Sequence, residues 1–203
     1  MKILAVSGSL RAGSYNTALA RAARELAPPD VEVELYEGLA RLPAYDQDLD
    51  EGSAATPPAV RKLRQRIEDA DALLFVTPEY NGSIPGVLKN AIDWASARHR
   101  GSSFTNKTVA IAGVTTGEFG AIWAQQDLRK VLGISGARVI HGELPVPRGQ
   151  EVFDETGRLI DPLVAERLRE HLTHLVAEAQ PQVRTGLEND EGPREAAPVV
   201  VLR

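Results

Sequence analysis

The sequence contains no cysteine among its 203 residues. This absence excludes disulfide frameworks, thiolate zinc sites, iron–sulfur clusters and cysteine nucleophiles. A chain without cysteine fits a reducing compartment, so we expect a cytoplasmic protein. No apolar run approaches the roughly 20 residues that a membrane-spanning helix needs. The apolar run at 3–6 is too short for the core of a signal peptide, so we expect no membrane partner.

Positive charge is also scarce in this chain. It has 23 Lys and Arg against 28 Asp and Glu, which gives a net charge of −5 at pH 7. Because binding to duplex nucleic acid requires clustered Lys and Arg that neutralise phosphates, we expect no nucleic-acid partner. The length suits one domain whose hydrophobic core is large enough to fold without disulfides.

Apolar patterns alternate between strand and helix along the chain. Continuous apolar runs are typical of strands covered on both faces, and an i, i+3, i+4 spacing is typical of helices. This alternation predicts an α/β fold in which a parallel sheet lies between helices. We expect residues 1–179 to form the domain and residues 180–203, which are charged and aperiodic, to form a mobile tail. Strands are predicted at 3–6, 31–35, 72–76, 109–114 and 137–140, and helices at 16–27, 57–69, 86–95, 120–132 and 161–179.

The loop after the first strand is rich in hydroxyl and amide side chains. It enters a helix, and helix N-termini present N–H groups and a positive dipole end to anions. The dinucleotide motif G-x-G-x-x-G fails because Leu10 stands at its second glycine, and a P-loop fails because Ser14 follows Gly13 where a lysine is required. The loop therefore predicts a site for a terminal monophosphate without a metal ion. The alternative is a turn that only caps the helix. The candidate donors are Ser9, Arg11, Ser14, Asn16 and Thr17.

Two later loops leave predicted strands at the same edge, beyond which ligands bind in such sheets. The loop at 77–86 has two prolines and two glycines, which fix its backbone. The loop at 115–120 has two glycines that permit close backbone approach to a ligand. The rigid loop at 77–86 predicts contact with a flat polar ring, and its alternative is a plain connector. The loop at 115–120 predicts only close backbone approach to a ligand, and its alternative is an ordinary helix entry after a strand. The candidate residues are Pro78, Glu79, Tyr80, Asn81, Thr115, Thr116 and Gly117.

Other chemically active side chains are interpreted as structural. Trp94 is expected in the core or in an interface. The histidines of the last helix, His171 and His174, are expected on a solvated face, and no metal site is predicted. The long loop at 36–57 is a candidate for lining the pocket or a subunit contact through Tyr45, because long loops are often functional.

The loop motifs together resemble the NAD(P)H-dependent FMN reductase family, which includes quinone, azo-dye and chromate reductases. The resemblance runs from residue 1 to about 179. It implies a flavodoxin-like three-layer sandwich with a five-stranded parallel sheet in the order 2-1-3-4-5. It also implies bound FMN, with its phosphate on the first loop and its ring against the second and third loops. The motifs are Gly8-Ser9-Leu10-Arg11 with Ser14 and Asn16, and the unbroken run from Thr77 to Trp94.

The resemblance further implies ping-pong hydride transfer from NADPH or NADH to FMN and on to a quinone-like, azo or other acceptor, or to free flavin. Such chemistry needs no catalytic side chain, since the cofactor carries it. Members are commonly homodimers or homotetramers. Glu118, Ala121 and Trp123 depart from the glycine, glycine and arginine that many members have there, so anionic acceptors are disfavoured. Arg98 and Arg100 are candidates for a 2′-phosphate contact.

Two alternatives remain open at this point. One is a flavodoxin-type electron carrier that binds FMN without oxidising NAD(P)H. The other is a regulator or scaffold that keeps the fold and binds no flavin, since a fold alone does not determine function.

Overall fold

The computed structural model describes residues 1–50, 56–96 and 101–180. A six-stranded sheet runs through its centre, and every strand pair is parallel. The strands are β1 (Lys2–Ser7), β2 (Glu32–Tyr36), β3 (Ala72–Val76), β4 (Thr108–Val114), β5 (Arg138–Val139) and β6 (Leu144–Val146). Their order is β2-β1-β3-β4-β5, with β6 also pairing with β4. The predicted strand order is confirmed.

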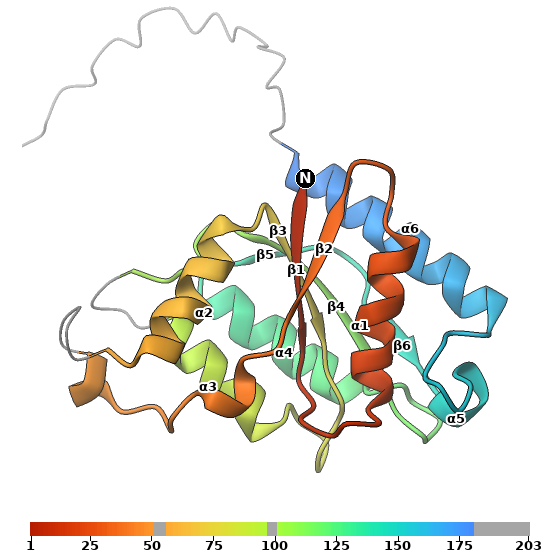
Figure 1. The fold of residues 1–203 in the computed structure, drawn as a ribbon, viewed down its shortest axis with the longest axis horizontal. Helices are drawn as coiled ribbons and strands as arrows, with labels where there is room; N and C mark the ends of the chain where they lie inside the picture. Colours follow the sequence, from red (N-terminus) through yellow and green to blue (C-terminus); the bar gives the residue numbers. More distant parts are fainter. Residues whose placement is uncertain (51–55, 97–100, 181–203) are drawn as a thin grey trace, which may run out of the picture.

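Helices cover both faces of the sheet (Figure 1). The long helices are α1 (Tyr15–Leu26), α2 (Pro58–Asp69), α3 (Gly86–Ala95), α4 (Ile122–Ile134) and α6 (Pro162–Ala179). Apolar side chains of α1 and α6 fill the core on one face, and those of α2, α3 and α4 fill the core on the other. The predicted sandwich of a parallel sheet between helices is therefore confirmed.

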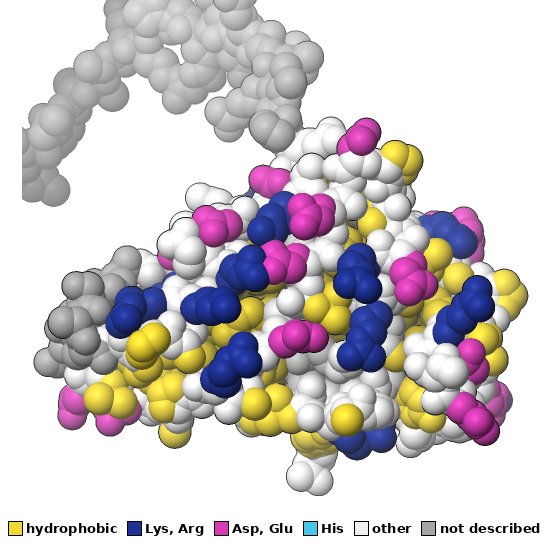
Figure 2. All heavy atoms as spheres, viewed as in Figure 1, with side chains coloured by type: hydrophobic (Ala, Val, Ile, Leu, Met, Phe, Trp, Pro, Cys, Tyr) yellow, Lys and Arg dark blue, Asp and Glu magenta, His cyan; other side chains and the backbone are white. Residues whose placement is uncertain are grey.

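Polar residues define where the helices begin. The Ser14 side chain accepts hydrogen bonds from two N–H groups of the first turn of α1, and Asp161 does the same for α6. Pro162 follows Asp161 as the first residue of α6, where its missing N–H costs nothing. On the face shown in Figure 2, Lys and Arg side chains are interspersed with acidic ones.

The last part of the sheet differs from the prediction. A single strand at 137–140 was expected, but two short strands share the edge of β4. The first, β5, pairs with Thr108 and Val109, and β6 pairs with the stretch from Ala112 to Val114. Gly142, with a φ of 79°, lies between them where the chain bends. The one-turn helix α5 (Gly149–Val152) and two 3-10 turns, η1 (Leu39–Arg41) and η2 (Gln47–Asp50), were also not predicted.

The prediction for His171 was wrong. It is buried, and its Nε2 is 3.0 Å from the carbonyl oxygen of Ile111 in β4. Burial lowers the pKa of His171 to about 4, so the imidazole is neutral near pH 7. His174 is exposed as expected. Trp94 is fully buried, which confirms its predicted place in the core.

Two earlier predictions fall outside the described residues. They concern Arg98 and Arg100, and the tail from residue 181 onward. Within the described ranges, none of the helices has the length and apolar character needed to cross a lipid bilayer.

Candidate functional site

Three loops meet at one edge of the sheet. They follow β1, β3 and β4, which are neighbours, and Figure 1 shows them together along the lower edge of the molecule. The strand ends are in register, since Ser7 pairs with Val76 and Val76 pairs with Ala112. The sheet therefore brings the three predicted loops to one place.

The first loop, between β1 and α1, is tied down at both ends. The Gly8 N–H donates to the Val76 carbonyl oxygen over 2.8 Å. A Cβ at Gly8 would lie 2.9 Å from Leu88 Cδ2, so the loop passes too close to α3 for a side chain there. The hydroxyl groups of Ser7 and Thr17 are 2.9 Å apart and link the end of β1 to the first turn of α1.

Two predicted donors of this loop have structural partners. The Ser14 hydroxyl accepts the N–H groups of Asn16 and Thr17 and caps α1. The buried Asn16 amide donates to the Val114 carbonyl oxygen and accepts the Val114 N–H, both over 2.9 Å. These side chains hold the loop and the end of β4 in place.

The rest of the loop is suited to an anion. In the described structure, the N–H groups of Leu10, Ala12 and Gly13 donate no hydrogen bond within the protein. The Arg11 guanidinium is exposed and lies 5.9 Å from the centroid of the Tyr15 ring. Residues 8–17 contain no acidic side chain. Free N–H groups beside a helix N-terminus, together with an arginine, form an anion-binding arrangement.

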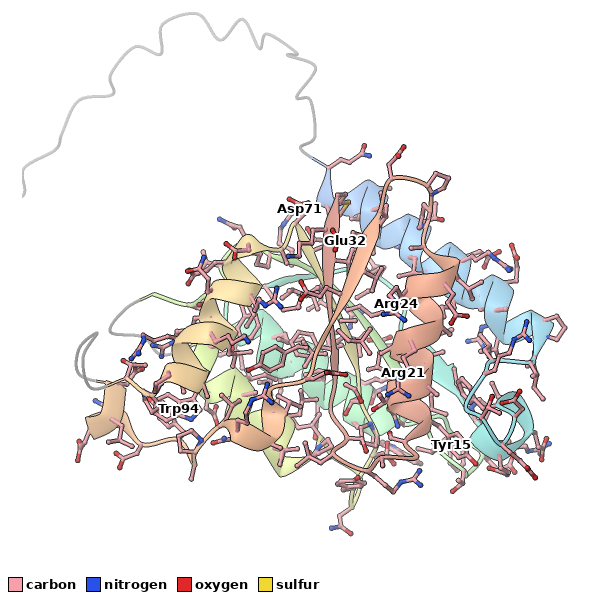
Figure 3. The ribbon with its side chains drawn as sticks, viewed as in Figure 1. Tyr15, Arg21, Arg24, Glu32, Asp71 and Trp94 are labelled. Carbon is pink, nitrogen blue, oxygen red and sulfur yellow. The ribbon has the colours of Figure 1, made fainter. Side chains whose placement is uncertain are left out.

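A cavity of about 250 Å³ lies beside this loop. Its lining includes Ser9, Arg11 and Thr17, joined by Arg21 from α1 and by Glu37 after β2. Figure 3 shows Arg21 on α1, next to β2. Of the ion pairs among the described residues, none involves Arg11 or Arg21, so both guanidinium groups are available to a ligand.

The second loop, between β3 and α3, contains a two-residue hairpin. Tyr80 and Ser83 exchange backbone hydrogen bonds of 3.0 and 3.2 Å. Asn81 and Gly82 between them have φ angles of 54° and 73°, which is the geometry of a type I′ turn. Sequence analysis missed this hairpin, although the Asn-Gly pair is its usual signal. The turn leaves Tyr80 and Asn81 exposed at the tip of the loop.

The second loop is fixed to the start of α4. The Glu79 carboxylate accepts the Ala124 N–H over 3.1 Å, and the Ser83 hydroxyl donates to Asp127 over 2.7 Å. Glu79 thereby supplies the negative group that a helix N-terminus favours. The predicted residues Pro78 and Glu79 therefore set the position of Tyr80 relative to α4.

The third loop, between β4 and α4, is bonded through its carbonyl groups to residues 148–149. The Thr115 and Gly117 carbonyl oxygens accept the N–H groups of Gly149 and Arg148 over 2.9 and 3.1 Å. In the part of the chain that the structure describes, the Thr116 and Gly117 N–H groups donate to no protein atom. The loop therefore offers backbone donors to a group with negative charge.

Glu118 is paired rather than isolated. Its two carboxylate oxygens accept hydrogen bonds from Arg148 Nε and Nη2 at 2.9 to 3.1 Å. This guanidinium holds the pKa of Glu118 below its usual range. The pair offsets the charge that was expected to disfavour anionic acceptors.

Residues below the third loop determine where α4 begins. The Gln125 side chain, which is buried, donates to the Gly120 carbonyl oxygen over 2.7 Å. Its Oε1 has no hydrogen-bond partner among the described residues. A Cβ at Gly113 in β4 would lie 2.8 Å from Ala121 Cβ and 3.0 Å from Gln125 Nε2. The start of α4 thus packs directly on the backbone of β4.

A known protein family matches the part of the chain that forms this site. Residues 1–151 match the family described as NADPH-dependent FMN reductase. The chain belongs to this family. The three donor-rich loops lie within the matched residues, and the family's FMN requires a phosphate site and a site for a flat ring. The residues present fit both needs, through Arg11 and free N–H groups at the first loop and through backbone donors at the third.

Similar proteins in this family reduce flavins and quinones, as their names state. The chain is 43% identical over 176 residues to an NAD(P)H-dependent FMN reductase of Pseudomonas aeruginosa, covering 86% of this chain and 93% of that one. It is 40% identical over 161 residues to a 2-hydroxy-1,4-benzoquinone reductase of a Burkholderia species, covering 79% and 86%. The flavoenzyme NAD(P)H:(acceptor) oxidoreductase FerB of Paracoccus denitrificans superimposes with a TM-score of 0.79 at 34% identity, covering 88% and 96%.

Proposed function

We propose that this protein is an FMN-dependent oxidoreductase that takes hydride from NADPH or NADH and passes electrons to a quinone-like, azo or other small acceptor, or to free flavin. The observation that carries the proposal is the meeting of three loops at the carboxyl edge of the sheet in a chain of the FMN reductase family. Bound FMN would accept the hydride and release the electrons. The side chains bind and orient, and no catalytic side chain is needed.

The first loop is assigned to the phosphate. Ser9, Arg11 and Thr17 line one cavity and offer a guanidinium and hydroxyl groups. Ser14 and Asn16 support them by capping α1 and by holding Val114. A dianionic phosphate gains most from the charge-assisted hydrogen bonds of Arg11.

The second and third loops are assigned to the ring. Pro78, Glu79, Tyr80 and Asn81 would lie against it on the second loop, and Thr115, Thr116 and Gly117 on the third. The N–H groups of Thr116 and Gly117, which have no partner among the described residues, would stabilise negative charge on a reduced flavin. These donors are held in place beforehand by the carbonyl bonds to residues 148–149, so they need no rearrangement when charge appears.

The proposal also covers assembly and cellular location. We assign the chain to a homodimer or homotetramer in the cytoplasm. Size-exclusion chromatography with light scattering measures the oligomeric state, and cell fractionation measures the location.

Absorbance spectroscopy tests the function. The purified protein, or the protein reconstituted with FMN, is expected to show a flavin spectrum that bleaches anaerobically with NADPH or NADH and returns when a quinone is added. A protein that binds FMN but is not bleached by either nucleotide would be an electron carrier. A colourless protein that cannot be reconstituted would refute the flavin site.

Replacement of Arg11 tests the phosphate assignment. Arg11→Ala is expected to raise the Kd for FMN by roughly 10- to 100-fold, since a hydrogen bond to a charged group contributes about 1.5–3 kcal/mol. The matched control is Arg24→Ala, on α1 and labelled in Figure 3, but outside the 250 Å³ cavity. Equal FMN retention by Arg11→Ala and the wild type would contradict the assignment.

A further inference from the structure

Arg11 is held in place without an acidic partner. Its side chain is exposed, and of the ion pairs among the described residues none includes its guanidinium. Its Nη1 lies 3.5 Å from the position that a Cβ at Gly13 would occupy. Its Cζ lies over the Tyr15 ring, 5.9 Å from the centroid, which is within the range where an aromatic face attracts a cation. The guanidinium therefore lies close to the backbone of Gly13 and to the ring of Tyr15.

The Tyr15 ring is itself fixed by the segment that contains α5. It stacks on the buried ring of Phe153, with the centroids 5.7 Å apart and the planes inclined at 18°. A Cβ at Gly149 would lie 2.8 Å from Tyr15 Cδ2, so the backbone of α5 approaches the ring closely. Figure 3 shows Tyr15 at the lower end of α1, on the side where Figure 1 places α5. These contacts set the position of the ring.

The same segment holds the third loop. The Gly149 N–H donates to the Thr115 carbonyl oxygen over 2.9 Å, and the Arg148 N–H donates to the Gly117 carbonyl oxygen over 3.1 Å. Residues 148–153 therefore contact the helix that follows the phosphate loop as well as the loop assigned to the flavin ring. The position of the Tyr15 ring is thus fixed relative to both.

An aromatic ring holds a guanidinium differently from a carboxylate. A carboxylate would fix Arg11, but it would also offset the positive charge and compete with an anionic ligand for the N–H donors. The face of a ring attracts the cation through its quadrupole and leaves the donors in the guanidinium plane available. Because an arginine that is already held loses less rotamer freedom on binding, such a ring also reduces the entropic cost of ligand capture.

We propose that Tyr15 is a positioning residue for the phosphate of FMN. Its ring, supported by Phe153 and Gly149, holds the Arg11 guanidinium beside the N-terminus of α1 while leaving its charge and its donors to the phosphate. This inference rests on the proposed function and specifies how the phosphate site of that function is organised.

Equilibrium binding of FMN and of riboflavin to the full-length apoprotein tests this role. The two flavins share the ring and the ribityl chain, and only FMN carries the phosphate. Tyr15→Leu is expected to raise the Kd for FMN roughly fivefold, because the cation–π contact and the ordering of Arg11 are both lost. The Kd for riboflavin should change less than twofold. Tyr15→Phe, the matched control, keeps the ring and should leave both values within twofold. Quenching of flavin fluorescence measures both constants.

A double-mutant cycle separates positioning from a general structural role. In the Arg11→Ala background, Tyr15→Leu should raise the Kd for FMN less than twofold, because the group that Tyr15 positions is already absent. Circular dichroism checks that each variant is folded. Tyr15→Met takes the place of Tyr15→Leu in both backgrounds if the leucine variant does not fold, since the flexible methionine fills the space without an aromatic face.

Three results would overturn the inference. The first is an unchanged Kd for FMN when Tyr15 is replaced by leucine or methionine. The second is an equal rise for FMN and riboflavin, which would assign a purely structural role to Tyr15. The third is a full fivefold effect in the Arg11→Ala background, because Tyr15 would then act independently of Arg11. In each case, a wild-type protein that binds FMN and is bleached by NADPH or NADH would leave the proposed function standing, whereas a wild type that binds neither flavin would refute both.

Discussion

The connections that follow β2 and β4 differ in both length and partners. The connection after β2 runs from residue 37 to residue 57, and the one after β4 runs from residue 115 to residue 121. In the described part of the long connection, polar groups are bonded to α2 and α3. In the short connection, the N–H groups of Thr116 and Gly117 have no partner among the described residues, and the Phe119 ring is exposed.

Buried polar contacts fix the long connection. Asp50 is fully buried and receives two hydrogen bonds from Arg64, of 2.8 and 2.6 Å. The Pro43 carbonyl oxygen accepts the Trp94 Nε1–H and an amide proton of Asn90, and the Tyr45 ring packs edge-on against Trp94. Figure 3 shows Trp94 well away from Tyr15 and the first loop. These contacts assign residues 43–50 of the long connection to the support of α2 and α3, whereas Glu37, Leu39 and Ala40 at its start line the 250 Å³ cavity beside the first loop.

The comparison teaches that the length of a loop is a poor guide to its role. Long loops are often functional, which made residues 36–57 a candidate for lining the pocket or a subunit contact. The better guide is where the polar groups of a loop find their partners. Groups satisfied inside the protein stabilise it, and groups left free at a strand edge are available to a ligand.

The largest expected effect is a loss of stability when Asp50, in the long connection, is replaced. Asp50→Ala removes one partner of a buried ion pair and leaves the Arg64 charge uncompensated. The free energy of unfolding should fall by about 3–5 kcal/mol, measured by urea denaturation. Asp48→Ala, at an exposed position in the same turn, should change it by less than about 0.5 kcal/mol. If Asp50→Ala weakened FMN binding while stability stayed constant, the contrast between the connections would fail.

The next largest effect expected is a pH dependence of stability that arises from His171, which contacts β4. His171 contacts Ile111 in β4, and burial lowers its pKa to about 4. Because the folded pKa lies below the ordinary value of about 6.5, the unfolded chain binds the proton more readily. The contribution of neutral His171 to the free energy of unfolding is therefore fully present above pH 6.5. It falls by roughly 3 kcal/mol as the pH drops from 6.5 to 4. Denaturation of His171→Gln at several pH values should show a flatter profile, and an unchanged slope would contradict the assignment.

Replacement of Asn16 tests whether its amide supports the structure or contacts FMN. Asn16→Ala leaves the N–H and carbonyl oxygen of Val114 without their partners, at the base of the short connection. Unfolding free energy should fall by about 2 kcal/mol, while the Kd for FMN should rise less than threefold. Isothermal titration of the folded variant with FMN measures the second quantity. A rise as large as that of Arg11→Ala would assign the Asn16 amide to the phosphate instead.

The smallest effect is expected at the exposed ion pair. Glu118→Gln removes the two-oxygen partner of Arg148, which keeps only the longer pair with Glu151, and should lower the KM for an anionic sulfonated quinone about threefold, whereas Arg148→Gln should raise it by a similar factor. Neither change should affect a neutral quinone. Arg148 keeps the pKa of Glu118 below its usual range, so the Glu118 carboxylate stays ionised between pH 5.5 and 8. Titration of Glu118 should therefore contribute nothing to the pH dependence of the wild-type KM over this range. Effects of the same sign in both variants would contradict the charge-balance interpretation.

Sequence alone predicted the central strands because β1, β3 and β4 are continuous apolar runs. It could not predict β6, which has three residues with a proline in the middle and pairs only because β4 offers it an edge. His171 was placed wrongly because the helical spacing of two histidines does not say which one meets a carbonyl group of a strand.

The sequence showed which loops would meet at the site, but it did not show which side chains would bond to which groups there. The order of the elements brings the three loops together, and this could be reasoned from a parallel sheet. The partner of Asn16 is 98 residues away, and the carboxylate of Glu79 reaches a helix 45 residues away. Pairings over such separations depend on packing, which local patterns do not encode. Arg148 was missed because nothing near it in the sequence suggests that it meets Glu118.

Gly113 connects the interior of the sheet to the third loop. It touches no proposed ligand, yet a methyl group at this position would lie 2.8 Å from Ala121 Cβ and from the Thr77 carbonyl oxygen, and 3.0 Å from Gln125 Nε2. A substitution hidden in β4 would therefore displace the start of α4 while every exposed residue stays as it is.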